Sequence, residues 1–230
     1  MHVEFCSSPH NNHDPVTGQI FMRSSTKSDK AEKKPRGRPR AYDPETALRQ
    51  AAEAFWKAGY SGTSLDDISA ATGMNRPSLR AAFGDKRDIY VRALSDYWEL
   101  KFAAMHKAFE RGGTLAETLM RVYDQALSIY FSGDDQVLGC FVVGTAVTEA
   151  PGDPEIQRIA AKGFRLLDAD FEARFKVARA AGELKPGADP KTLALLATAT
   201  MQTLAIRARV GSSRNELRKL AQKAVSVICG

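Results

Sequence analysis

The chain has 230 residues, of which 43% are hydrophobic and 26% charged, a balance ordinary for a folded protein with its own core. The three cysteines lie far apart and are odd in number, so no disulfide framework is expected. We find no secretory signal peptide and no apolar run of the roughly 20 residues that cross a bilayer. The sequence therefore predicts a cytoplasmic protein with no membrane partner.

Positive charge is concentrated at the start of the chain. Residues 1–41 hold eight Lys or Arg and four Asp or Glu, a net charge of +4, whereas the whole chain carries +6. Residues 1–40 also contain few large apolar side chains, so they cannot bury enough surface to order themselves. We expect them to form a disordered basic arm ahead of a nearly neutral body. Whether residues 1–21, which precede Met22, are physiological is left open.

Helix-capping signals recur from residue 43 onward. A cap residue is followed either by proline or by an acid three positions later, and both patterns begin helices. These cap residues are Asp43, Ser64, Asp85, Thr114, Asp153, Asp189 and Ser213. Residues 137–150 are apolar on all sides, which predicts a buried helix. No segment has a convincing two-residue alternation, so we expect an all-α fold of about nine helices.

Residues 64–83 have the pattern of a helix-turn-helix. Leu65 and Ile68 mark the inner face of a first short helix, and Gly73 suits a tight left-handed turn. Leu79 and Phe83, four positions apart, anchor a second helix. The outward positions of that second helix are Asn75, Arg76, Pro77, Ser78 and Arg80. Such donors suit the major groove of DNA.

Residues 41–94 resemble the N-terminal domain of TetR-type regulators. The matching positions are Ala51, Ala52, Phe55, Gly59, Tyr60, Thr63, Ser64, Leu65, Ile68, Gly73, Leu79, Phe83 and Lys86. The resemblance implies a three-helix DNA-binding domain over residues 41–94 and an effector-binding and dimerisation domain over residues 95–230. It also implies a homodimer that represses from a palindromic double-stranded DNA operator and releases it when a small molecule binds.

The resemblance also assigns individual DNA contacts. Thr63 and Lys86 would touch phosphates, and residues 75–80 would face bases or backbone. Family members usually carry tyrosine and histidine where this chain has Arg80 and Ala82. We expect Arg80 to contact DNA in place of the missing aromatic ring, either at a phosphate or at guanine.

The basic arm contains a second candidate DNA reader. Arg36, Arg38 and Arg40 lie in a Pro-Arg-Gly-Arg-Pro-Arg segment that resembles the core of an AT-hook. Such a segment lies flat in a narrow minor groove, where the negative potential attracts arginine. An alternative follows from this arm, namely an architectural protein that prefers A·T-rich DNA without operator specificity.

Aromatic residues of the C-terminal half are candidates for an effector pocket, and they indicate a hydrophobic or aromatic ligand. They are Tyr97, Trp98, Phe102, Tyr123, Tyr130 and Phe164, joined by Cys140. The Gly-Cys-Phe segment at Cys140 also resembles the start of a central helix in one subgroup of the family. A redox-sensing role for Cys140 is an alternative, but its sequence neighbours include no cation, which favours an inert buried thiol.

The last two predicted helices, residues 189–210 and 213–228, have apolar or small faces. The residues on these faces are Leu193, Leu196, Thr200, Leu204, Leu217, Leu220 and Ala224. The resemblance implies that such a helix pair meets its two-fold mate in a four-helix bundle.

Catalysis is not expected, because His106 is the only histidine after position 13 and leaves little material for a catalytic site. No cofactor is expected either. His2, Cys6, His10 and His13 have ligand-like spacing, so a metal-responsive regulator is a further alternative, although the prediction for the chain is no metal site.

Overall fold

The computed structural model describes residues 42–133 and 136–230. Over these residues the fold is all-α, as predicted, with nine α-helices, one π-helical segment (η1) and no strand. The helices are α1 Pro44–Ala58, α2 Leu65–Thr72, α3 Arg76–Phe83, α4 Lys86–Glu110, α5 Leu115–Tyr130, η1 Val142–Ala146, α6 Val147–Glu149, α7 Pro154–Ala180, α8 Pro190–Arg209 and α9 Arg214–Cys229. None of them is long and apolar enough to cross a membrane.

The predicted caps start the helices. The Asp43 carboxylate accepts a hydrogen bond from the Thr46 backbone N–H at 2.9 Å, and Pro44 follows in the first turn. Reciprocal capping boxes begin α2, α4, α5 and α9, where the cap side chain and the acid three residues later each accept a backbone N–H. The starts of these capped helices are therefore decided locally.

The prediction of one buried helix over residues 137–150 is wrong at its beginning. Residues 136–140 are not helical, and the helical segment starts at Phe141 and passes through η1 into α6. Gly139 has φ 66°, and a Cβ on it would lie 2.8 Å from the Ala205 carbonyl oxygen of α8. This close approach to another helix holds the chain in a non-helical conformation, and hydrophobic pattern alone cannot reveal it.

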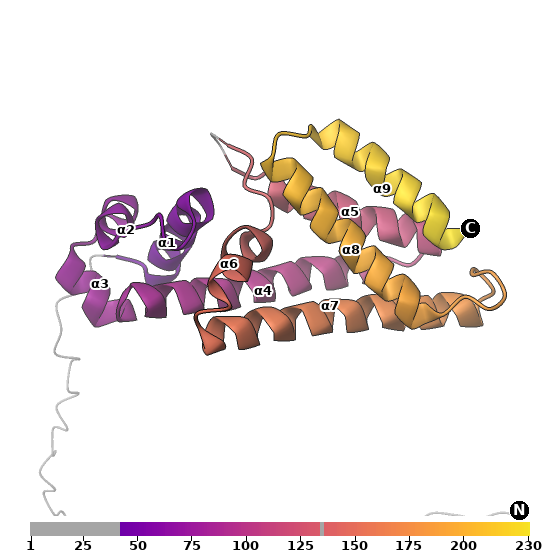
Figure 1. Cartoon of the computed structure of the whole chain (residues 1–230), viewed down its shortest axis with the longest axis horizontal. Helices are drawn as coiled ribbons and strands as arrows, with labels where there is room; N and C mark the ends of the chain where they lie inside the picture. The colour runs from indigo at the N-terminus through magenta and orange to yellow at the C-terminus, as the bar shows by residue number, and fades with distance from the viewer. Residues whose placement is uncertain (1–41, 134–135) are drawn as a thin grey trace, which may run out of the picture. The chain divides into compact units, whose positions relative to one another are not determined.

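Helices α1, α2 and α3 lie beside the N-terminal part of α4 (Figure 1). Phe55, Ile68 and Leu79 are buried at their centre, and the Phe55 ring meets Tyr90 of α4 edge-on, with centroids 5.1 Å apart. The predicted domain boundary between residues 94 and 95 falls inside α4, so one continuous helix joins the two predicted domains.

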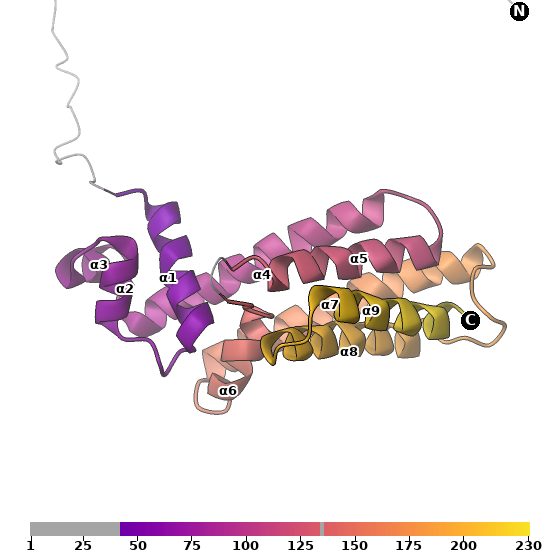
Figure 2. The ribbon, with the colours of Figure 1, turned by 90° about the horizontal axis from the view of Figure 1, so that it is seen from above.

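The remaining helices pack along the rest of α4. Helix α7 lies beside α4, and α8 and α9 form an adjacent pair that packs against α7 and α5 respectively (Figure 2). Leu119, Phe171 and Leu204 are fully buried between them. Residues 42–133 and 136–230 thus share one continuous apolar core.

Candidate nucleic-acid interface and effector cavities

The turn between α2 and α3 is held by side chains as well as backbone. Gly73 adopts φ 65°, in the left-handed region that favours glycine. Met74 then points into the core, with only 5% of its surface exposed. The Ser69 hydroxyl donates to the Met74 carbonyl, and the Thr72 hydroxyl donates to the Ile68 carbonyl at 2.7 Å. The orientation of α3 relative to α2 is consequently well fixed.

The outward face of α3 carries the predicted polar groups. The Asn75 side-chain oxygen accepts the Ser78 backbone N–H at 2.9 Å, so Asn75 is the N-cap of α3. Pro77 and Arg80 are exposed and Ser78 is half-buried. No carboxylate of the described residues forms an ion pair with Arg80. Its guanidinium can therefore meet an anion such as a phosphate or a base edge.

Arg76 has a partner that the sequence did not reveal. Its guanidinium forms a two-point ion pair with the Asp66 carboxylate of α2, with Nε 2.6 Å from Oδ1 and Nη2 in contact with Oδ2. The hydrogen bonds from Arg76 lower the pKa of Asp66. Both side chains are mostly exposed. Asp66 therefore orients Arg76 on the surface and offsets part of its charge.

The two predicted phosphate contacts are placed differently. Thr63 is 1% exposed, and its hydroxyl donates to the Gly59 carbonyl at 2.7 Å, so its side chain closes the end of α1 and does not face solvent. Lys86 is half-buried at the first position of α4, with its ammonium 4.3 Å from the centroid of the Tyr60 ring. This placement favours Lys86 over the Thr63 side chain as a phosphate contact.

Two groups of predicted residues lie outside the described residues. These are the arm arginines, Arg36, Arg38 and Arg40, and the candidate metal ligands, His2, Cys6, His10 and His13. Across residues 42–133 and 136–230, no cluster of His, Cys, Asp and Glu could hold a metal ion.

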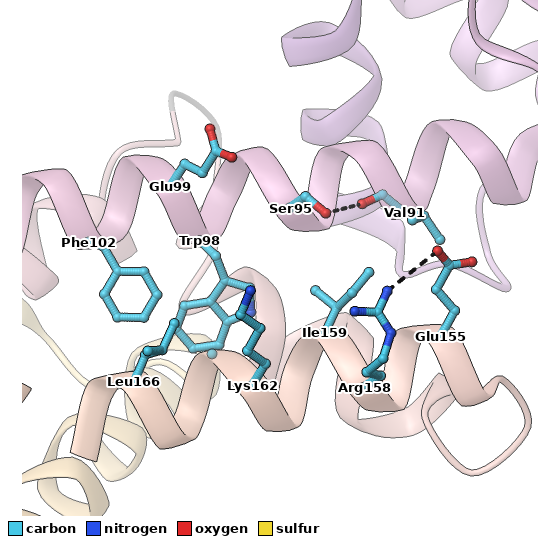
Figure 3. Close-up of a pocket in the computed structure, with 11 residues that line it drawn as sticks. Val91, Ser95, Trp98, Glu99, Phe102, Glu155, Arg158, Ile159, Lys162 and Leu166 are labelled. Carbon is cyan, nitrogen blue, oxygen red and sulfur yellow. Dashed lines mark hydrogen bonds and ion pairs between the residues drawn. The ribbon is translucent and has the colours of Figure 1, made fainter. Parts of the chain in front are cut away.

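A first cavity, of about 330 Å³, lies between α4 and α7 (Figure 3). Trp98 projects from α4 toward α7 and stacks on Phe102, with ring centroids 5.2 Å apart. The Trp98 indole N–H is buried and has no hydrogen-bond partner within the part of the chain that the structure describes. Charged side chains of both signs also line the cavity, namely Glu99, Glu155, Arg158 and Lys162.

A second cavity, of about 270 Å³, lies where α1 meets α4 and α5. Trp56 of α1 and Tyr97 of α4 form an aromatic wall, their rings meeting edge-on at 5.2 Å. Lys101 of α4 and Ile129 of α5 also line it. Neither Trp56 nor Lys101 was predicted as a pocket residue, because one lies in the predicted DNA-binding domain and the other is a charged residue on an apolar face.

The predicted pocket aromatics are divided between the cavities and the core. Trp98 and Phe102 line the first cavity and Tyr97 lines the second, while Phe164 packs edge-on against Trp98 with centroids 5.6 Å apart. Tyr123 and Tyr130 line neither of these two cavities. Both are fully buried, and their hydroxyls donate to the carbonyls of Ala197 and Met201 of α8. These two hydrogen bonds connect α5 to α8 within the core.

Cys140 has a cationic neighbour that is distant in sequence. The Lys101 ammonium lies 3.9 Å from its sulfur, and the Tyr97 hydroxyl donates to the same sulfur at 3.3 Å. Burial raises the pKa of Tyr97, so its hydroxyl stays protonated and remains a donor. Cys140 is 2% exposed. The thiol is buried as predicted, but the fold brings a cation from α4 beside it, which the sequence neighbours of Cys140 do not indicate.

The predicted dimerisation residues fall into two sets. Leu196 is 49% exposed on α8, and Leu193, Thr200, Leu220 and Ala224 are half-buried. Leu204 and Leu217 are buried in the chain's own core and have no surface to offer a second subunit. Four further apolar side chains are exposed on the last two helices or just after α8: Leu195, Ile206, Val210 and Val227.

Comparisons with known proteins agree with this architecture. Residues 47–93 match the bacterial regulatory proteins of the tetR family, and residues 116–224 match the tetracyclin repressor-like C-terminal domain. The HTH-type transcriptional repressor ComR of Escherichia coli (strain K12) is 32% identical over 199 residues, which cover 86% of this chain and 94% of ComR. The uncharacterized HTH-type transcriptional regulator YezE of Bacillus subtilis (strain 168) is 28% identical over 84% of this chain and 99% of its own.

Among solved structures, a cysteine-substituted form of the TetR-family regulator CifR, complexed with 26 bp double-strand operator DNA, superposes with a TM-score of 0.75. It is 26% identical and covers 83% of this chain and 98% of its own. The fold and the helix-turn-helix define a DNA-binding transcriptional regulator. The chain belongs to the TetR family.

Proposed function

We propose that the protein is a ligand-responsive repressor that binds a palindromic operator as a homodimer in the cytoplasm. The observation that carries this proposal is the exposed face of α3, where Arg80 has no carboxylate partner among residues 42–133 and 136–230 and the helix is held firmly by its turn. ComR, which is named as a repressor, and CifR, which was solved with operator DNA, support the same function for this chain.

The DNA contacts follow from exposure and charge. Residues 75–78 lie at the N-terminal end of α3, the part of a recognition helix that reaches base edges. Arg80 contacts a phosphate or a guanine, and Lys86 contacts a phosphate from the start of α4. Arg76 joins them while it remains oriented by Asp66. The arginines at positions 36, 38 and 40 add a minor-groove contact beside each half-site.

The dimer forms through α8 and α9. Leu196 is exposed there, and the partly exposed Leu193, Thr200, Leu220 and Ala224 belong to the same helix pair. Exposed apolar side chains gathered on adjacent helices mark an interaction surface. A two-fold axis through this surface pairs two recognition helices, as a palindromic site requires.

The effector site lies in the C-terminal half. The cavity between α4 and α7 has stacked aromatic rings and a buried indole N–H that lacks a partner among the described residues, which suits an aromatic ligand that carries one hydrogen-bond acceptor. Helix α4 runs from this cavity to the helix-turn-helix, so a shift of α4 on ligand binding would move both DNA-reading surfaces.

The decisive experiment is a footprint of the full chain on a discrete palindrome selected from genomic fragments, repeated with Arg80→Ala. Loss of the Arg80 contact should weaken operator binding by about 1–3 kcal/mol and leave the melting temperature unchanged, because the side chain is exposed. Arg165→Ala, an exposed arginine on α7, is the matched control and should bind normally. Protection without a palindrome, or full affinity of the Arg80 variant, would contradict the proposal.

A further inference from the structure

Lys101 of α4, which lines the cavity between α1, α4 and α5, is a buried basic residue. Lys101 is 3% exposed, and its ammonium contacts the Cys140 sulfur at 3.9 Å and lies 5.2 Å from the centroid of the Trp98 ring. Within residues 42–133 and 136–230, no carboxylate forms an ion pair with it. A thiol and a ring face compensate an ammonium poorly, and burying such a charge without a counter-ion is strongly unfavourable.

The surroundings of Lys101 suit an anion. The other lining residues are aromatic, aliphatic or neutral and polar: Trp56, Tyr97, Leu100, Gln125, Ser128, Ile129 and Ser132. The cavity opens to solvent beside Leu100, which is 72% exposed. The α4–α7 cavity differs, because Glu99 and Glu155 there oppose the two cations. Of the two cavities, the one at Lys101 therefore carries an unbalanced positive charge.

We propose that this cavity binds a small planar carboxylate, with Lys101 as its counter-ion and Trp56 and Tyr97 as the wall against its ring. A carboxylate beside the Lys101 ammonium forms a charge-assisted hydrogen bond in a weakly screening environment, where such pairs are strongest. The volume of about 270 Å³ is below the roughly 300–1,000 Å³ of drug-sized sites, so the ligand is small.

The position of Trp56 couples this site to the DNA-binding helices. Its indole N–H donates to the Leu138 carbonyl at 3.1 Å. Arg209 of α8 donates to the same carbonyl at 2.9 Å and to the Trp56 carbonyl at 3.0 Å. Helix α1 in turn packs on α2. A ligand that contacts Trp56 can therefore disturb the hydrogen bonds that connect α1, residues 136–140 and α8. This regulatory consequence rests on the proposed function, whereas carboxylate binding does not.

The binding test uses the full chain without DNA and benzoate as the probe, followed by titration calorimetry. Benzoate should bind, and benzamide, which has the same shape without the charge, should bind at least about 30-fold more weakly. Lys101→Met should lose benzoate affinity by a similar factor. Lys162→Met, which removes an exposed lysine of the α4–α7 cavity, should bind benzoate like the unchanged protein.

The melting temperature of each variant separates binding from folding. Lys101→Met should melt at the same temperature or higher, since it replaces an uncompensated buried charge by an apolar chain. Equal binding of benzoate and benzamide, or full benzoate affinity in Lys101→Met, would overturn the proposal. A third result would also overturn it: no binding of benzoate, together with fast reaction of Cys140 with iodoacetamide that becomes slow in Lys101→Met. Lys101 would then be the counter-ion of a Cys140 thiolate.

Operator release tests the coupling. Benzoate should lower operator affinity of the unchanged protein. Arg209→Met, which does not line the cavity, should still bind benzoate while losing most of that effect, because it lacks the hydrogen bonds to the Trp56 and Leu138 carbonyls. Benzoate binding with no change in operator affinity would overturn the regulatory link. Absence of any operator binding, with benzoate binding intact, would count against the proposed function alone.

Discussion

Gly163 leaves the space that the Trp98 indole occupies between α4 and α7. A Cβ on Gly163 would lie 2.0 Å from the indole Cε2, a distance at which atoms overlap. The indole is thereby seated directly against the α7 backbone, with Phe102 stacked on one side and Phe164 edge-on. A glycine within a helix is unfavourable, so its presence here serves this close packing.

Gly163→Ala should therefore destabilise the chain. The added methyl group displaces Trp98, and overpacking of this kind costs about 1–3 kcal/mol. Thermal unfolding should show a lower melting temperature and a changed tryptophan fluorescence. Gly152→Ala, where a new Cβ would make only an ordinary contact of 3.7 Å with the Glu149 carbonyl oxygen, is the control without steric overlap. Recovery of stability in the double variant Gly163→Ala/Trp98→Leu is expected, and failure to recover would contradict the steric explanation.

At the scale of helices, α4 and α7 are joined near their N-terminal ends by an ion-pair cluster. The Arg87 guanidinium of α4 donates to both carboxylate oxygens of Asp153, with Nη2 2.9 Å from Oδ1 and Nε in contact with Oδ2. Its Nη2 also donates to the Glu155 carboxylate at 2.9 Å. Asp153 is also the N-cap of α7. Its hydrogen bonds from Arg87 lower its pKa from 3.8 to about 2. The same carboxylate thus begins one helix and fixes it to another.

The stabilisation from Arg87 should depend on pH. A carboxyl whose pKa is lowered by folding contributes stability above its unfolded pKa and loses it as the pH falls through the folded value. Arg87→Met should therefore be less stable than the unchanged protein at pH 7, and the difference should shrink between about pH 4 and pH 2. Urea unfolding across this range measures it. Arg158→Met, which removes a longer ion pair within α7, should show a smaller effect, and a pH-independent difference would exclude the mechanism.

The sequence predicted these helices well because their starting signals are local. Capping residues such as Ser64 and Thr114 form hydrogen bonds three residues away, so their role can be read without tertiary structure. Gly139 and Lys101 could not be read this way. The non-helical conformation at Gly139 depends on the nearby backbone of α8, and the environment of Lys101 includes a thiol 39 residues further along the chain. Periodicity also could not tell that Leu204 faces inward while Leu196 faces solvent.

At the scale of the whole molecule, most of the net positive charge belongs to the arm, while DNA recognition requires the folded part as well. Deleting residues 1–40 removes eight basic and four acidic residues. If three arginines of the arm contact phosphates or the minor groove, the slope of log affinity against log salt should become shallower by about 2–3. The triple variant Arg36→Ala/Arg38→Ala/Arg40→Ala should reproduce most of this change, and an unchanged slope would remove the arm from the interface.

Dimerisation through α8 and α9 predicts the effect of one exposed leucine. Leu196→Glu places a carboxylate in the proposed interface, where desolvation opposes association, so sedimentation should show a shift from dimer to monomer. Operator affinity should fall by about 100-fold or more, because each half-site then binds independently. Leu100→Glu alters a leucine that is 72% exposed on α4, outside the proposed interface, and should remain dimeric. A Leu196→Glu protein that stays dimeric would place the two-fold contact elsewhere on the surface.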